Sequence, residues 1–334
     1  MESPTQPGLY PCKLQPIFKE RIWGGRNLAR LYGKQLPAGR PIGESWEISD
    51  RPRDQSVISN GPLAGKDLRW LMENHEHELL GKSPGQGGRF PLLIKLLDAQ
   101  EKLSLQVHPP AALAAQLGGE PKTEMWYIAD AAPGADIFVG LRAGCTRAEF
   151  EEKIKTGHVA ECFHRIPVQA GDAMFLPSGR VHALGAGNVI FEVQQNSDTT
   201  YRVFDWNRVG LDGKPRELHV EQSLASIDFE DFEPSLITSK YSVNPTLAVR
   251  FLVDNPLFRV DATKVKRGER FYLRSDSVQI LGLLRGRLRI SGGGEELVLQ
   301  PGGFVMLPAA LERAALQAET QVEFLHIQAG LGAP

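Results

Sequence analysis

The sequence has 334 residues, of which 42% are hydrophobic and 23% charged, and its formal net charge is −2 at pH 7. This length is enough for one large or two ordinary domains, and the composition is typical of a globular protein. The small net charge and the absence of long runs of like charge exclude a polybasic membrane contact and an extended nucleic-acid-binding face.

The three cysteines, Cys12, Cys145 and Cys162, are far apart and odd in number, which argues against a disulfide framework and for a reducing compartment. The segment 1–16 lacks the apolar core of a signal peptide, and no stretch approaches a membrane-spanning length. We therefore expect a cytoplasmic protein that binds neither nucleic acid nor membrane. The sequence predicts no particular oligomeric state.

The predicted elements begin with a helix at 67–81, where Asp67 is the expected N-cap and leucines recur with helical spacing. A second helix at 109–119 starts with proline and ends in glycine, and a third at 146–157 opens with a capping box. Elsewhere, glycines and prolines separate short apolar runs, a pattern typical of strands joined by turns. Strands are predicted at 91–99, 103–108, 125–130, 135–141, 172–177, 188–195, 258–265, 277–286, 287–292, 295–302, 303–308 and 322–329.

Two segments, 169–184 and 300–316, share a glycine, an apolar stretch and a Leu-Pro pair followed by a turn. His182 follows the first Leu-Pro pair, whereas no histidine follows the second. We interpret the two segments as an internal repeat of related β-barrels, with coincidence between two turn segments as the alternative. A change in composition then divides the chain into predicted domains 1–235 and 236–334.

The segment LSLQVHPP places Gln106 and His108 two residues apart in a predicted strand. Alternate side chains of a strand point to the same face, so an amide oxygen and an imidazole nitrogen are expected to converge on one point. Ser104 has the same parity, whereas the apolar positions 103, 105 and 107 are expected to face the other side. A polar patch in the core is the alternative interpretation of this segment.

Glu124 and His182 extend the candidate metal site. Glu124 stands immediately before an apolar strand, where a carboxylate is out of place unless it faces a cation or solvent. His182 lies among glycines, which predicts a turn at the mouth of a barrel. Two imidazoles, one carboxylate and one amide oxygen suit one zinc ion (Zn²⁺) per chain, with manganese, iron or cobalt as alternatives.

Several segments, in order along nearly the whole chain, resemble the type I mannose-6-phosphate isomerases of the cupin superfamily, in particular the short bacterial form without a large helical insertion. They are IWGG, GESWEIS, PLLIKLLDAQEKLSLQVHP, KTEMWY, VQAGDAMFLPSGRVHAL and QNSDTTYRVFDWNR. The resemblance implies a mainly β fold of two cupin-type (jelly-roll) β-barrels with a few short helices. Domain 1–235 would be the metal-containing catalytic cupin, and domain 236–334 a metal-free cupin-like β domain.

The resemblance also assigns roles to individual residues. It implies that Gln106, His108, Glu124 and His182 bind the metal. Its D-x-x-x-R segment matches Asp198 and Arg202, and it implies that Arg202 lies in the active site. An arginine there would stabilise negative charge on an enediolate; a surface arginine paired with Asp205 is the alternative.

Three further residues complete the predicted site. Lys122 is two residues from Glu124 and is a candidate phosphate contact or, like Asp198, a candidate proton carrier. A solvated lysine beside a turn is an equally plain interpretation of Lys122. Ser104 and Lys95 resemble family residues near the substrate phosphate. Trp46, in GESWEIS, is expected to be a buried anchor rather than a wall that stacks on a sugar.

The function that these residues predict is a metal-dependent aldose–ketose isomerase that interconverts mannose 6-phosphate and fructose 6-phosphate through an enediolate, with a small phosphosugar as its partner. The alternatives are a non-catalytic sugar-binding or regulatory cupin, a cupin isomerase of another phosphosugar, and a metal oxygenase. A pure binding protein would not need Lys122, Asp198 and Arg202 beside the metal ligands. An oxygenase would bind its metal through two histidines and one carboxylate, so the additional ligand Gln106 distinguishes the predicted isomerase from an oxygenase.

Overall fold

The computed structural model describes residues 8–274, 276–311 and 313–330, and the chain is mainly β, as predicted. The expectation that the segment 1–16 is not a signal peptide falls partly on residues 1–7, which lie outside the described residues. No helix within it is long and apolar enough to cross a membrane. The described helices are α1 (Asn27–Tyr32), α2 (Leu68–Leu80), α3 (Ala111–Ala114), α4 (Arg147–Thr156) and α5 (Val220–Ser226), together with a short 3₁₀ turn, η1 (Val159–Cys162).

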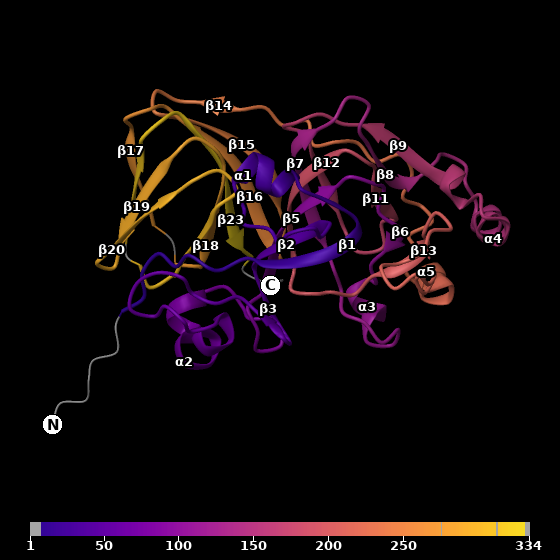
Figure 1. Cartoon of the computed structure of the whole chain (residues 1–334), viewed down its shortest axis with the longest axis horizontal. Helices are drawn as coiled ribbons and strands as arrows, with labels where there is room; N and C mark the ends of the chain where they lie inside the picture. Colours follow the sequence, from indigo (N-terminus) through magenta and orange to yellow (C-terminus); the bar gives the residue numbers. More distant parts are fainter. Residues whose placement is uncertain (1–7, 275, 312, 331–334) are drawn as a thin grey trace.

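Two antiparallel sheets form the first β unit, drawn from indigo to pink in Figure 1. The larger sheet has six strands in the order β1 (Ile17–Gly25), β2 (Ile42–Ile48), β5 (Leu92–Ala99), β12 (Asn188–Gln195), β7 (Glu124–Ala131) and β10 (Ala173–Leu176). The smaller sheet has the order β13 (Tyr201–Phe204), β6 (Leu105–Val107), β11 (His182–Leu184), β8 (Asp136–Leu141) and β9 (Phe163–Pro167). A two-stranded ribbon pairs β3 (Asp50–Arg51) with β4 (Asp54–Gln55).

The second unit, orange to yellow in Figure 1, has the same plan. Its larger sheet runs β14 (Ser242–Val243), β15 (Leu247–Asp254), β16 (Phe258–Val265), β23 (Val322–Ala329), β18 (Gln279–Arg285) and β21 (Phe304–Leu307). Its smaller sheet runs β17 (Arg270–Leu273), β22 (Ala314–Ala318), β19 (Leu288–Gly292) and β20 (Glu295–Leu299). The two six-stranded orders correspond position by position, which supports the predicted repeat, and the predicted boundary falls between β13 and β14.

The central strands of the large sheet in the first unit, such as β5 and β12, are buried on both faces. In β5, Leu92, Ile94 and Leu96 pack into a core that also contains residues of the second unit, such as Phe258 and Ile327. The intervening positions of β5 face the small sheet of their own unit. Because both faces are covered, these strands read as nearly continuous apolar runs.

The helices predicted at 67–81 and 146–157 are confirmed, with the side chain of Asp67 capping α2 and that of Thr146 capping α4. The helix predicted at 109–119 is shorter than expected, because only Ala111–Ala114 are helical and turns follow them. Helices α1 and α5 and several strands, β1 and β2 among them, were not predicted. Trp46 is buried, as expected, and all three cysteines are free and buried. The parity predicted for 103–108 holds for Leu105 and Val107 but is wrong for Leu103, because β6 begins only at residue 105 and Leu103 lines the inner cavity.

Candidate active site

Three buried side chains, His108, Glu124 and His182, converge inside the first unit. Their potential ligand atoms all lie within 4.8 Å of one another. His108 Nε2 is 3.4 Å from Glu124 Oε2, and His182 Nε2 is 3.3 Å from Glu124 Oε1. The exposed fraction of each side chain is 1% or less. The structure thus brings together three of the four predicted metal ligands around one point.

Strand pairing explains this convergence. Glu124 is the first residue of β7 and faces inward, opposite Met125, which packs into the core between the units. The prediction of a turn at His182 is wrong, because His182 is the first residue of β11. It pairs directly with Gln106 of β6. His108 follows β6 immediately. The cluster therefore bridges the two sheets of the first unit.

The donor set fits a transition metal. Both ring nitrogens of His108 and both carboxylate oxygens of Glu124 are buried without a hydrogen-bond partner, which is costly unless another group satisfies them. His182 Nδ1 lies 2.9 Å from the carbonyl oxygen of Arg180, so Nε2 faces the cluster. A carbonyl oxygen bound to the other ring nitrogen is the usual way of orienting a metal-ligating histidine.

The charges of the cluster also suit a cation. Burial, reinforced by the nearby Lys122 ammonium, lowers the pKa of His108 to about 3. Burial likewise lowers the pKa of His182. The pKa of Glu124 lies well below its usual value, because Lys122 and His108 outweigh the burial that opposes ionisation. At neutral pH the cluster therefore offers two neutral imidazoles and one carboxylate, the forms that bind metals.

Gln106 lies beside the cluster. Its Nε2 is 3.3 Å from His182 Nε2, and its Oε1 is 3.5 Å from the hydroxyl of Ser104. Rotation of the amide by half a turn would exchange the two atoms and present the oxygen to the cluster. The inward parity predicted for Ser104, Gln106 and His108 is therefore consistent with the observed contacts.

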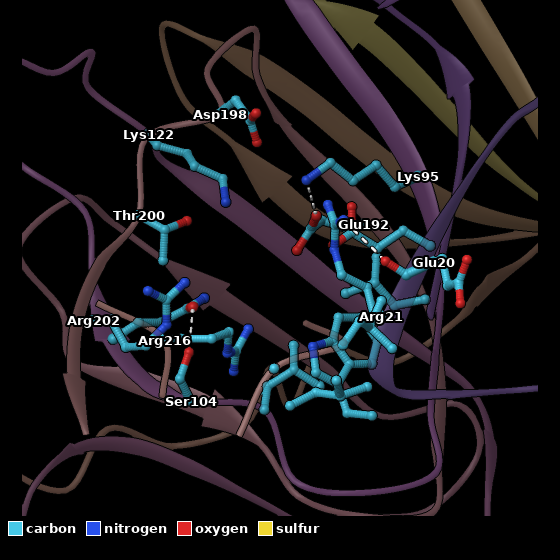
Figure 2. Close-up of a pocket in the computed structure, with 18 of the residues that line it drawn as sticks. Glu20, Arg21, Lys95, Ser104, Lys122, Glu192, Asp198, Thr200, Arg202 and Arg216 are labelled. Carbon is cyan, nitrogen blue, oxygen red and sulfur yellow. Dashed lines mark hydrogen bonds and ion pairs between the residues drawn. The ribbon is translucent and has the colours of Figure 1, made fainter. Parts of the chain in front are cut away.

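A cavity of about 540 Å³ adjoins the cluster through Gln106 and Lys122. Figure 2 shows the amino groups of Lys122 and Lys95 approaching from opposite walls, with Arg202 and Arg216 on a third side. The predicted residues Ser104, Lys95, Lys122, Asp198 and Arg202 all line this cavity. Its volume and its convergent polar groups are those of a site for a small, charged molecule.

Arg202 reaches the cavity from β13. Its Nη1 donates a hydrogen bond of 2.6 Å to the carbonyl oxygen of Glu217, and its Nε is buried without a partner. Asp205 is paired with Arg208 and Arg216, and no Arg202–Asp205 pair occurs among the described side chains. The alternative interpretation of Arg202 as a surface residue paired with Asp205 is therefore wrong.

The cavity also contains residues that the sequence did not single out. Glu192 of β12 binds Lys95 Nζ at 3.1 Å through Oε2 and accepts a hydrogen bond of 2.9 Å from the indole of Trp126. Glu44 of β2 binds Arg21, and the cations Arg21 and Lys95 lower its pKa to about 2 although burial opposes this. The signal that could have identified Glu192 is its position in the apolar run NVIFEVQQ. A charged side chain within a buried strand needs a partner of opposite charge or a functional role.

Replacing Lys95 with methionine should lower the free energy of unfolding by about 3 kcal/mol, because Glu192 would remain buried without its cation. Urea denaturation at pH 7 measures this loss. The loss should be smaller at pH 5, since burial raises the pKa of Glu192 and an unpaired carboxyl can take up a proton in the folded state.

The matched control is Lys155→Met, which removes an exposed pair with Glu152 and should cost less than about 0.5 kcal/mol. The double variant Lys95→Met/Glu192→Gln should recover part of the loss, because no unpaired charge remains. Equal stability of Lys95→Met and Lys155→Met would contradict the interpretation of a structurally important buried pair.

Known proteins resemble the chain over nearly its full length. Residues 12–135 match the family model of the phosphomannose isomerase type I catalytic domain. A probable mannose-6-phosphate isomerase of Bacillus subtilis, GmuF, is 35% identical over 320 residues, which cover 95% of this chain and 99% of that protein. A mannose-6-phosphate isomerase of Streptococcus mutans is 35% identical over 95% of this chain and 98% of its own length. The crystal structure of the mannose 6-phosphate isomerase from Bacillus subtilis superposes with a TM-score of 0.87 at 32% identity, covering 96% of this chain and 99% of that one.

Proposed function

The chain belongs to the type I mannose-6-phosphate isomerases, a metal-dependent family, and from this premise we propose that its cavity interconverts mannose 6-phosphate and fructose 6-phosphate. The observation that carries the proposal is the buried cluster of His108, Glu124 and His182 at the wall of a cavity lined by lysines and arginines. A phosphosugar needs positive charge for its phosphate, and an isomerase needs it for the developing enediolate.

We assign one metal ion per chain to His108, Glu124 and His182, with Gln106 as the fourth ligand once its amide oxygen turns inward. The mixed nitrogen and oxygen donors favour zinc. When bound, the ion supplies a Lewis acid that polarises a substrate oxygen. A cation at this point would also satisfy the buried oxygens of Glu124, which have no hydrogen-bond partner. The ammonium of Lys122 lies 3.2 Å from one of them, Oε2.

Isomerisation moves a proton from C2 of the aldose to C1. A base removes the C2 proton, the electron pair forms the C1–C2 double bond, and the carbonyl oxygen gains negative charge. Return of the proton to C1 then gives the ketose, with a proton transferred between the two oxygens. Lys122 and Asp198 face the cavity and are the side chains proposed to carry these protons. The Arg202 guanidinium, which lines the cavity, is the group proposed to stabilise the enediolate.

Ser104 and Lys95 are proposed to contact the substrate away from the reacting carbons. Lys95 is held by Glu192 and also lies 5.4 Å from the centre of the Trp46 ring, so it is a fixed rather than a mobile cation. Burial opposes its charge, but the surrounding carboxylates, Glu192 and Glu44 foremost, raise its pKa. A fixed charge that anchors the phosphate lowers the entropic cost of positioning the reacting atoms.

A coupled assay that supplies mannose 6-phosphate and follows fructose 6-phosphate tests the proposal, with metal analysis on the same sample. Turnover that disappears with a chelator and returns with zinc is the expected result. Tight binding of mannose 6-phosphate by metal-loaded protein without turnover would favour the sugar-binding cupin instead. Faster turnover of a different phosphosugar would favour an isomerase of another substrate.

A further inference from the structure

A second cavity, of about 530 Å³, opens in the C-terminal β unit, remote in sequence from all of the proposed catalytic residues. Strands β15, β16, β17 and β23 and the segment before β15 supply its walls. Its polar lining includes Arg259, Asp261, Thr263 and His326, and its apolar lining includes the rings of Phe251 and Tyr272. Its volume is close to that of the first cavity.

The register of the strands relates the two cavities. In the first unit, Glu192 of β12 is paired with Lys95 of β5 on one side and with Trp126 of β7 on the other. In the second unit, β23, β16 and β18 hold the corresponding places in the sheet, and His326 is paired with Asp261. Asp261 thus occupies the position of Lys95, and His326 that of Glu192.

The inward direction of these side chains follows from the alternation along β16. Phe258, Val260 and Ala262 pack into the core between the units, as the corresponding residues of β5 do. Asp261 and Thr263 therefore face the small sheet of the second unit, where both line the cavity. The second cavity thus lies at the place in its own unit that the candidate active site occupies in the first.

Asp261 lines this cavity, and one of its two carboxylate oxygens has no hydrogen-bond partner. The residue is only 5% exposed, and its Oδ1 is buried without a hydrogen-bond partner. Its other oxygen, Oδ2, accepts a hydrogen bond of 3.3 Å from Arg259 Nε. A buried carboxylate oxygen without a donor is costly, and a ligand hydroxyl would satisfy it once the Asp261 side chain turns Oδ1 toward the cavity.

The neighbouring groups do not form a metal site. Among the described residues, the cluster of His108, Glu124 and His182 is the only group of three or more histidine, cysteine or acidic side chains arranged to hold an ion. His326 Nε2 lies 2.6 Å from Gln279 Oε1 and so donates to it. Burial, reinforced by Arg259, lowers the pKa of His326 to about 4, so the ring is neutral at pH 7.

We propose that this second cavity binds an uncharged polyhydroxylated molecule of about the size of a monosaccharide. The carboxylate of Asp261 and the hydroxyl of Thr263 would bind its hydroxyl groups. Phe251 and Tyr272, with exposed fractions of 53% and 45%, offer apolar ring surface at the cavity for its C–H face. Of the described residues in the lining, Arg259 alone carries a cationic side chain, and its charge is already matched by Asp261, which favours an uncharged ligand over a phosphosugar.

The test measures binding of D-mannose and D-mannitol by isothermal titration calorimetry and saturation-transfer NMR. Wild-type protein and the His182→Ala variant should bind the sugar equally, since the metal centre takes no part. Asp261→Asn should raise the Kd about tenfold or more, because the ligand hydroxyl loses its charged acceptor. Thr263→Val, which keeps the side-chain shape, should weaken binding in the same direction and serves if Asp261→Asn does not fold.

Asp254→Asn is the matched control, because Asp254 also lies near Arg259, at 4.0 Å, but does not line the cavity. Its Kd should equal that of wild-type protein. Binding that survives in both Asp261→Asn and Thr263→Val, or that disappears in His182→Ala, would overturn the inference. Binding of mannose 6-phosphate at this cavity more tightly than mannose would overturn the assignment of an uncharged ligand.

Isomerisation of mannose 6-phosphate provides the independent readout. Asp261→Asn should retain kcat/KM within about twofold, since Asp261 is not in the catalytic unit. Failure of the isomerase assay in wild-type protein would count against the proposed function and leave the second site to be judged by its own binding data.

Discussion

Replacement of His182 with alanine should remove the bound metal and reduce turnover by about 10³-fold or more in the same protein. The imidazole belongs to one of the three proposed ligands, whose potential ligand atoms are buried and lie within 4.8 Å of one another. Loss of one ligand from such a set leaves an incomplete coordination shell, and the several kcal/mol of charge stabilisation that the ion supplies in the transition state are lost with it. Metal analysis after dialysis and the coupled isomerase assay measure the two effects on one sample.

His158→Ala is the control for this experiment, because His158 is exposed and remote from the cluster. It should retain both metal and turnover. A His182→Ala protein that lost its metal and still turned over at the wild-type rate would contradict the metal-centred mechanism. Retention of stoichiometric metal by that variant would instead remove His182 from the set of ligands.

Replacement of Arg202 with lysine should leave the metal content unchanged and lower kcat by about 10²- to 10³-fold. The guanidinium is held in place before substrate binds by the hydrogen bond from Nη1 to the carbonyl oxygen of Glu217. Removing one preorganised donor to a developing oxyanion typically has an effect of this size. Lysine keeps the charge but cannot reproduce the planar arrangement of donors.

Arg208→Lys is the matched control, since Arg208 is also an arginine of the first unit with a charged partner, Asp205, but does not line the cavity. Its kcat should remain within about twofold of the wild-type value. The effect of Arg202→Lys should fall mainly on kcat rather than on KM, because the proposed contact strengthens as the enediolate forms. A near-normal kcat for Arg202→Lys would exclude a catalytic role for Arg202.

Local pattern was sufficient for much of the site. The spacing of Gln106 and His108 predicted that both side chains lie on one face of a short strand. In the structure Gln106 lies in β6, His108 follows it, and both side chains contact the same cluster. Glu124 stood out because a carboxylate beside an apolar run needs a cation or water. The helix caps at Asp67 and Thr146 were equally local, since a cap depends on a side chain and a backbone amide only a few residues apart.

Other features depended on partners that are distant in the sequence. The parity of Leu103 was wrong because β6 starts two residues later, and the start of a strand is set by its pairing with β11 and β13. The ion pair between Lys95 and Glu192 joins residues 97 positions apart, on neighbouring strands of one sheet. No local pattern identifies which carboxylate neutralises a buried lysine.

The sequence by itself determined the mainly β class, the helix caps and the cluster of candidate ligands, because alternation along a strand and capping at a helix end depend on neighbours along the chain. Only the tertiary structure decided that the central strands of the first large sheet are buried on both faces, that Glu192 holds Lys95, and that Asp261 takes the corresponding position in a second cavity. The physical reason is that the register between distant strands, fixed by the packing of two sheets against a shared core, determines which polar side chains meet.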